Sequence, residues 1–387
     1  EISTRDWSSD VCSSDLLAML PRGFLKNLDA GLIGSSGLLA LIGLASLYSL
    51  GRQDPSGWMS QFSFNQAMWL VAAVILGIAC WTLNYRLWDR FSWALYIVNI
   101  ALLVGLLIAG MTIKGEATTR TLGAGSIQPS ELAKVLFIVT FAGYLARYRE
   151  EMDKLLFLSL AAAQFILPFI LIMLQPDLGT AIVFIIVFFA MLYVSGVDWL
   201  TVFVSMVALV SAGLAASPFA LKEYQFKRLI SFINPDADPL GSGYQLVQSK
   251  IAIGSGGLWG TGLLDSPQSG LGFLPASHTD FIFSSICEQA GFIGGAAVIL
   301  LFAWFLFRVV RIASQSEDLF AVYIAAGIFA MIAGQAIINI AMTMGLCPIT
   351  GLPLPFVSYG GSSMLVNAVA VGLLLNISIR RRKIMFG

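Results

Sequence analysis

The sequence has 387 residues, of which 58% are hydrophobic and 11% are charged, and its 22 basic and 22 acidic side chains cancel. A soluble domain carries roughly 25% charged residues, so a soluble globular fold of this size is excluded. The zero net charge argues against nucleic acid as a partner. Four scattered cysteines and a single histidine argue against a disulfide framework and a multi-histidine metal site.

The first segment, residues 1–16, differs from the rest of the chain. It is polar, repeats Ser-Ser-Asp at 8–10 and 13–15, and lacks the apolar stretch of a signal peptide. We interpret it as a non-native or disordered segment, and residues 17–387 as a single transmembrane domain.

Apolar runs close to the length needed to cross roughly 30 Å of hydrocarbon recur along the chain. Ten of them are predicted as transmembrane helices, at 31–50, 66–84, 92–112, 130–147, 155–174, 178–196, 198–219, 281–309, 318–344 and 356–379. The predicted fold class is therefore all-α, a polytopic membrane bundle of about ten helices.

Basic residues predict how this bundle is oriented. An even number of spans places both termini on one side of the membrane, and the segments on that side hold fourteen arginines and lysines. The short loops of the other side hold three, namely Arg52, Lys114 and Arg120. Positive charge favours the cytoplasm, so both termini are expected there.

The long segment 220–280, between the seventh and eighth spans, is then extracytoplasmic. Loops of this length in a compact protein are usually functional or disordered. Its aromatic and aliphatic residues argue against disorder, so we expect short interfacial helices over the outer mouth of the bundle.

Polar residues in the spans are costly, at roughly 2.5–3.5 kcal/mol for a mid-membrane charge, and need an explanation. Glu131 and Lys134 open the fourth span three residues apart and can pair on one helical face. They form either a self-neutralised structural pair or a polar wall at which Lys134 meets a phosphate. Arg120, just upstream, could bind phosphate in the same way.

Two further motifs carry carboxylates at helix starts. Asp177, in Gln-Pro-Asp at 175–177, is interpreted mainly as a helix N-cap. Asp280 lies where the long loop enters the eighth span, wet enough to reach substrate and dry enough to favour proton exchange, which suits a general base. An N-cap role is the alternative for Asp280. For His278, an interfacial hydrogen-bonding role is favoured over proton transfer.

The fourth motif joins the last two spans. Gln335 and Asn339 are one helical turn apart, and residues 345–363 are rich in proline and glycine. Irregular backbone at membrane depth is tolerated only where it is buried in protein or lines a watery cavity. The sequence therefore predicts a broken or re-entrant segment that faces a central cavity.

Four motifs together resemble the SEDS family (shape, elongation, division and sporulation). They are Gln-Pro-Ser-Glu-Leu-Ala-Lys at 128–134, Gln-Pro-Asp-Leu-Gly-Thr at 175–180, His-Thr-Asp-Phe-Ile-Phe at 278–283, and the run from Thr350 to Ser363. The resemblance extends from about Phe24 to the C-terminus. Residues 236–244 and 248–257 resemble the elongation branch of the family more than the division branch. Members usually carry Arg-Trp where this chain has Arg120 followed by Thr121, so an aromatic surface is missing there.

The resemblance implies a ten-helix peptidoglycan glycosyltransferase of the bacterial cytoplasmic membrane that polymerises lipid II on the outer face during cell elongation. Implied partners are a class B penicillin-binding protein transpeptidase, other membrane proteins of the elongation complex, and membrane lipid. The family's essential aspartate corresponds to Asp280. Substrate-binding roles are predicted for Arg120, Glu131, Lys134, His278, Glu288, Gln335, Asn339 and Ser358.

The predicted reaction is a single displacement with inversion. Asp280 deprotonates the 4-hydroxyl of the acceptor sugar, and undecaprenyl pyrophosphate leaves from the donor. Arg120, Lys134 or a divalent cation (Mg or Mn) stabilises the leaving group, although the sequence identifies no metal ligands. The alternatives are a flippase or transporter of the lipid-linked precursor, a division-specific paralogue of the same enzyme, and a non-catalytic scaffold.

Overall fold

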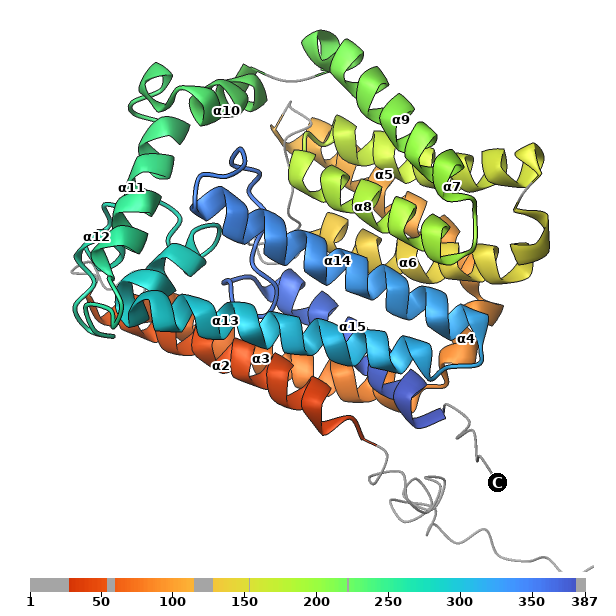
Figure 1. The fold of residues 1–387 in the computed structure, drawn as a ribbon, viewed down its shortest axis with the longest axis horizontal. Helices are drawn as coiled ribbons and strands as arrows, with labels where there is room; N and C mark the ends of the chain where they lie inside the picture. The colour runs from red at the N-terminus through yellow and green to blue at the C-terminus, as the bar shows by residue number, and fades with distance from the viewer. Residues whose placement is uncertain (1–27, 54–59, 115–127, 153, 221–222, 381–387) are drawn as a thin grey trace, which may run out of the picture.

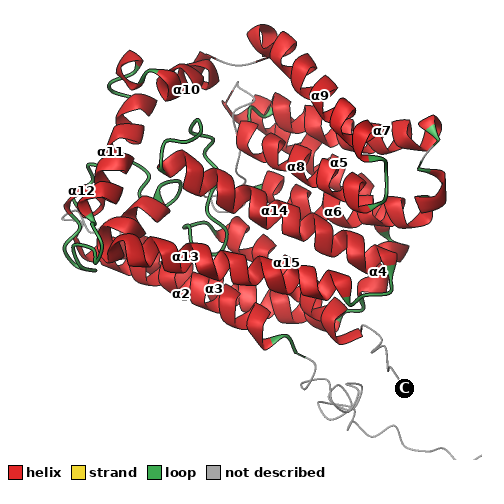
Figure 2. Cartoon of the chain, in the orientation of Figure 1, coloured by secondary structure: helices red, strands yellow, loops and turns green. Residues whose placement is uncertain are grey.

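The computed structural model describes residues 28–53, 60–114, 128–152, 154–220 and 223–380, and every regular element in these ranges is helical (Figures 1 and 2). Ten helices match the predicted spans: α2 (Ala30–Gln53), α3 (Ser60–Thr82), α5 (Ser92–Lys114), α6 (Pro129–Arg147), α7 (Leu155–Leu174), α8 (Leu178–Val194), α9 (Trp199–Ala220), α13 (Ile282–Ser314), α14 (Leu319–Thr343) and α15 (Gly361–Arg380). Eight contain a stretch long and apolar enough to cross a membrane, and α8 and the 199–213 part of α9 are shorter apolar helices. The polytopic all-α bundle is therefore confirmed. The predicted segment 1–16 lies outside the described residues.

Short helices cap the two ends of this bundle. The predicted long loop contains α10 (Glu223–Ile233), the 3₁₀ turn η3 (Pro235–Ala237), α11 (Ser242–Ser255) and α12 (Pro267–Gly270). They gather at the end where the loop between α14 and α15 also lies (Figure 1). At the opposite end lie α4 (Tyr85–Arg90) and the 3₁₀ turn η2 (Arg149–Glu151). The expected short helices over one mouth of the bundle are present.

Three helices form the buried centre. In the most apolar stretch of each helix, 83% of the residues of α6 and 72% of those of α14 and of α15 are buried. In α3 the corresponding share is 11%. Aromatic rings from α6, α7 and α8 fill the space beside α6, with Phe165 stacked on Phe188 at 4.3 Å and Phe137 near Phe184 at 5.1 Å between ring centroids. The central helices carry Glu131, Lys134, Gln335 and Asn339, and the surrounding helices shield these side chains from lipid.

A backbone break divides α13 near its start. Gly291 has φ 64° and ψ −161°, a conformation that only glycine adopts readily. The glycine-rich segment 257–262 packs against the break: Phe292 N–H donates to the Gly257 carbonyl at 2.8 Å, and Gly262 N–H donates to the Gln289 carbonyl at 3.1 Å. The loop thus satisfies backbone groups that an unbroken helix would have paired internally.

The last span begins later than predicted. Residues 344–360 form an irregular segment, and α15 starts at Gly361 instead of near 356. Pro353 and Pro355 lack the N–H groups that a helix needs, and Phe356 has φ 64°. The predicted broken segment between the last two spans is therefore present and longer than the predicted boundary implied.

Candidate functional site

Asp280 lies in the turn that leads into α13, at the end of the bundle covered by the short helices. Its side chain is half-buried, and its Oδ2 atom lies 3.5 Å from the point where a Cβ on Gly351 would stand. The N-cap position of α13 is occupied by Phe281, so the alternative of Asp280 as the N-cap is wrong. The carboxylate is not fully enclosed, as a general base that meets a substrate would require.

Three consecutive carbonyl groups of this turn accept hydrogen bonds from α14 and from the irregular segment 344–360. The backbone N–H of Tyr359 donates to the His278 carbonyl at 3.0 Å, Ser358 Oγ donates to the Thr279 carbonyl at 2.6 Å, and Asn339 Nδ2 donates to the Asp280 carbonyl at 2.9 Å. The turn is therefore fixed along its length. The motif at 278–280 and the motif at 350–363 form one structural unit.

The Asn339 and Ser358 side chains also hold the irregular segment 344–360 in place. Asn339 Nδ2 reaches the Leu352 carbonyl at 2.7 Å, and Ser358 Oγ accepts from the Leu354 N–H at 2.8 Å. Gln66 of α3, which sequence reasoning missed, donates to the Ser358 carbonyl and accepts from the Gly360 N–H, both at 3.2 Å. A lone buried glutamine in an apolar span was the available signal for Gln66.

His278 packs beside the site through its ring. It stacks on Phe62 with ring centroids 4.5 Å apart and planes 9° from parallel, and Tyr359 lies 6.1 Å away. Burial lowers the pKa of His278 below its ordinary value, which favours the neutral ring at pH 7. The hydrogen-bonding role of this side chain stays a prediction.

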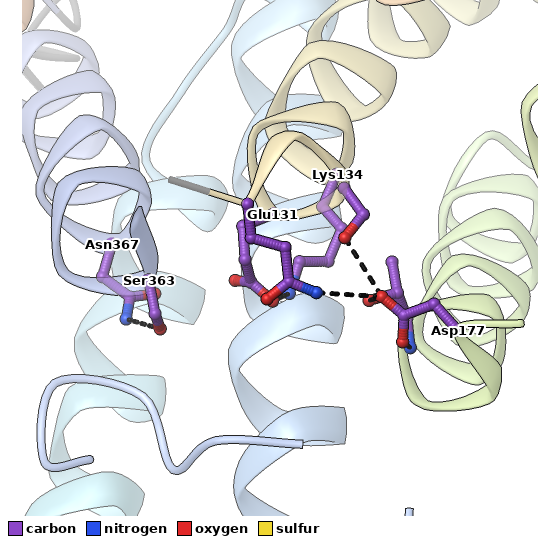
Figure 3. A network of polar contacts seen from close by, with 8 residues as sticks. Glu131, Lys134, Asp177, Ser363 and Asn367 are labelled. Carbon is purple, nitrogen blue, oxygen red and sulfur yellow. Dashed lines mark hydrogen bonds and ion pairs between the residues drawn. The ribbon is translucent and has the colours of Figure 1, made fainter. Parts of the chain in front are cut away.

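The Glu131–Lys134 pair forms on α6 as its spacing predicts. Lys134 Nζ lies 2.7 Å from Glu131 Oε1, and both side chains are almost fully buried. Figure 3 shows the pair between Asp177 at the start of α8 and the α15 residues Ser363 and Asn367, which are themselves joined at 3.4 Å. Two charges at this depth are tolerable because they neutralise each other.

Asp177 is the N-cap of α8, as predicted. Its Oδ1 accepts from the Thr180 N–H at 3.3 Å. Its Oδ2 also accepts from Thr180 Oγ1 at 2.9 Å, Gln128 Nε2 at 3.0 Å and Ser130 Oγ at 3.1 Å. This carboxylate therefore joins the start of α6 to the start of α8.

Glu288 lies apart from both groups. It is fully buried, and its oxygens accept from the N–H groups of Gln268 at 2.7 Å and Ser269 at 3.0 Å, and from the Ser269 hydroxyl. These bonds attach α12 to α13. Gln335 on α14 is also buried, and its Nε2 has no hydrogen-bond partner among the described residues. Arg120 lies outside the described residues.

Arg228 on α10 is a second residue that sequence reasoning missed. Its Nη1 lies 3.5 Å from the same Gly351 Cβ position as Asp280 Oδ2, and it donates to the Ile349 carbonyl at 3.4 Å. The available signal was a basic pair, Lys227-Arg228, inside the long loop. No group of three or more potential metal ligands occurs among the described side chains, so a divalent cation stays a prediction.

The chain matches a known protein family over most of its length. The family described as "Cell cycle protein", of FtsW, RodA and SpoVE, matches residues 29–383. Stage V sporulation protein E of Bacillus subtilis (strain 168) is 39% identical over 352 residues, which cover 88% of this chain and 94% of that protein. The probable peptidoglycan glycosyltransferase FtsW of Saccharophagus degradans is 38% identical over 373 residues, with 92% and 94% covered.

Solved structures with the same fold include the rod shape determining protein RodA of Thermus thermophilus, which is 26% identical with a TM-score of 0.68 over 92% of this chain and 98% of that one. A chain from a study of "polymerization and crosslinking by a peptidoglycan synthase complex" is 29% identical with a TM-score of 0.76, over 92% and 99%. With its motifs, its fold and these relatives in agreement, the chain belongs to the SEDS family of FtsW, RodA and SpoVE proteins.

Proposed function

We propose that this protein is a peptidoglycan glycosyltransferase that polymerises lipid II, with Asp280 as the general base. The observation that carries the proposal is the turn at 278–280, where three successive carbonyls are clamped and the Asp280 side chain stays half-exposed. A catalytic group needs such positioning, because a small displacement of the group from its substrate lowers the reaction rate by a large factor. The names of the FtsW relatives support the same reaction.

The proposed chemistry is one displacement. The Asp280 carboxylate takes the proton from the acceptor's 4-hydroxyl as its oxygen attacks the anomeric carbon of the donor, and the bond to undecaprenyl pyrophosphate breaks. A positioned base contributes roughly 10²–10⁴-fold to such a step. Lys134, Arg120 or a divalent cation would offset the charge that develops on the pyrophosphate.

The proposed orientation puts this site on the outer side of the cytoplasmic membrane, with both termini inside. Basic residues support it: Arg86, Arg147 and Arg308 lie towards the end opposite the Asp280 turn. The segments at that end hold more arginines and lysines than the short loops at the Asp280 end, and an excess of positive charge is typical of the cytoplasmic side.

The branch within the family is a separate proposal. The loop motifs at 236–244 and 248–257 favour elongation. The curated relatives with 35–39% identity, however, are named FtsW and Stage V sporulation protein E, whereas the RodA structure is 26% identical. We infer a division or sporulation role from these identities. Rescue of a strain depleted of FtsW, without rescue of one depleted of RodA, is the expected result.

We also propose a class B penicillin-binding protein as the membrane partner. The likeness to a chain of a peptidoglycan synthase complex supports this, since that study concerns polymerisation together with crosslinking. Co-purification of the two proteins from detergent-solubilised membranes would test the assignment.

The test of the function uses purified protein in vesicles with fluorescent lipid II. Long glycan products are expected. Leaflet exchange of the lipid without products would instead indicate the flippase, and neither activity would indicate a scaffold.

A further inference from the structure

Arg228 lies where three of the four motifs meet. Its guanidinium lies over the Tyr224 ring at 5.7 Å and donates to the Ile349 carbonyl at 3.4 Å, two residues before Gly351. Tyr224 in turn donates its hydroxyl to the Pro176 carbonyl at 2.7 Å. The arginine is thus anchored between the 175–180 motif and the 350–363 motif, next to the turn of the 278–283 motif.

Gly351 leaves the space between Arg228 and Asp280 open. Arg228 Nη1 and Asp280 Oδ2 each lie 3.5 Å from the position of a Gly351 Cβ, so at most twice that distance separates the two charged groups. Gly351 has φ +74°, which other residues rarely adopt. A side chain there would contact both the guanidinium and the carboxylate.

We propose that Arg228 is the charge partner of Asp280, a positioning residue that keeps the carboxylate ionised and ready to accept a proton. The inference rests on the proposed function, because it assigns Arg228 a role through the general base. At the half-buried end of a membrane bundle, desolvation favours the neutral acid, and a cation within several ångströms offsets it. Arginine suits this task because it stays protonated at any physiological pH.

Several described groups on the neighbouring elements have contacts of their own. On α10, Lys227 is exposed and pairs with Glu223 at 2.8 Å. On η3, Asp238 accepts from Ser242 N–H and Oγ at 2.8 and 2.9 Å. In the turn itself, the ring of His278 stacks on Phe62. From α14, the group that reaches the turn is the neutral amide of Asn339.

Lys250 of α11 is a further cation at this end. Its side chain packs against Gly345, six residues before Gly351 in the irregular segment. Arg228 Nη1, by contrast, lies 3.5 Å from the same Gly351 Cβ position as Asp280 Oδ2, and this proximity is the ground for pairing the two charges.

The pH dependence of lipid II polymerisation tests the inference. Arg228→Gln should move the acid limb of the rate profile to higher pH by about one unit, with activity recovering at alkaline pH. At the pH where wild type is half-active, the loss is about fivefold. Arg228→Lys should keep most of the wild-type profile. Lys227→Gln, which removes the same charge from the neighbouring position of α10, should leave the profile unchanged.

A second readout does not require activity. A carbodiimide modifies protonated carboxyl groups, and mass spectrometry of the peptide that contains Asp280 gives the labelled fraction against pH. The midpoint should rise in Arg228→Gln and stay in place in Arg228→Lys and Lys227→Gln. A wild type that makes no glycan would contradict the proposed function while leaving this labelling test intact.

Other outcomes overturn the inference. If Arg228→Gln lowers the polymerisation rate equally at every pH, through a higher KM, and the labelling midpoint does not move, Arg228 binds substrate or only shapes the loop. An unchanged profile with an unchanged midpoint would mean that its charge does not reach Asp280.

Discussion

Asn339 and Ser358 illustrate how the site is built at the scale of single residues. Substrate binding stays a prediction for both. In the structure both hold the backbone around Asp280: Asn339 Nδ2 donates to two carbonyls, and Ser358 Oγ donates to the Thr279 carbonyl and accepts from the Leu354 N–H. Each bond is worth about 1 kcal/mol net, and leaving a buried partner unsatisfied costs about 1–3 kcal/mol. Their effect on catalysis would therefore pass through the position of the carboxylate.

Replacing Asn339 tests this role. Asn339→Leu removes both donated bonds, so we expect a fall in kcat of at least tenfold with little change in KM, and a loss of about 1–3 kcal/mol in stability. Steady-state kinetics with lipid II and thermal unfolding in detergent measure the two effects. Gln335→Leu, one turn earlier on α14, is the matched stability control, because its Nε2 makes no hydrogen bond to a described residue. A raised KM at unchanged kcat would mean that Asn339 binds substrate directly.

The buried pair on α6 makes a second prediction at this scale. Lys134→Met leaves Glu131 without its partner at 2.7 Å, and breaking a buried pair this way costs about 3–5 kcal/mol. The double variant Glu131→Gln with Lys134→Met should regain most of that stability, because no unpaired charge remains. If Lys134 also meets the pyrophosphate, the double variant stays inactive. Full activity in the stable double variant would reduce the pair to a structural element.

The residue types at the site were predictable, and the contacts that depend on distant parts of the chain were not. His278, Asp280 and the Glu131–Lys134 pair stand out because charged or titratable groups are rare in an apolar chain. Whether Ser358 points at substrate or at the Thr279 carbonyl depends on a contact between residues 79 positions apart. Arg228 was overlooked for the same reason, since only the fold brings α10 next to Gly351.

At the scale of elements, the break in α13 joins the long loop to the spans. The first part of α13 carries Glu288, which accepts from the N–H groups of Gln268 and Ser269 at the start of α12. The Gly291 break then exposes backbone groups to which the 257–262 segment bonds. The loop is thereby fixed to the same helix that begins beside Asp280.

Glu288→Gln should loosen this attachment. An amide can accept from one of the two backbone N–H groups, but its own NH₂ faces the other donors, so we expect a loss of about 1–3 kcal/mol in local stability. Faster hydrogen exchange over residues 260–275, with unchanged exchange in α6, is the expected signature. Unchanged exchange in the loop would show that Glu288 does not hold α12.

Element positions followed well from the sequence, because hydrophobic runs of span length are a strong signal. The exceptions are instructive. The start of α15 was placed five residues early, since the apolar residues Phe356 and Val357 belong to a turn that positive φ and nearby prolines impose. The docking of 257–262 on Gly291 was invisible, because each partner alone looks like an ordinary glycine-rich stretch.

At the scale of the whole molecule, the two ends of the bundle differ in the structures that cover them. One end carries α10, α11 and α12 over the Asp280 turn, and the other carries α4 and the 149–151 turn (Figure 1). A lipid-linked substrate must reach the site from one leaflet, so orientation decides which precursor pool the enzyme can use.

Cysteine labelling in cells measures this orientation. In a variant whose native cysteines are replaced, Trp259→Cys, at an 81% exposed position of the loop, should react with a membrane-impermeant maleimide from outside. Glu150→Cys, exposed in the turn at the opposite end, should react only after the membrane is opened. The reverse pattern would place the site in the cytoplasm and contradict outer-leaflet polymerisation.

The most direct test of the account compares lipid II polymerisation by the wild type and by Asp280→Asn, both purified and shown to unfold at similar temperatures. The account predicts long glycan strands from the wild type and a loss of at least 10²-fold in the variant, because an amide cannot take the acceptor's proton. Near wild-type polymerisation by Asp280→Asn would contradict it.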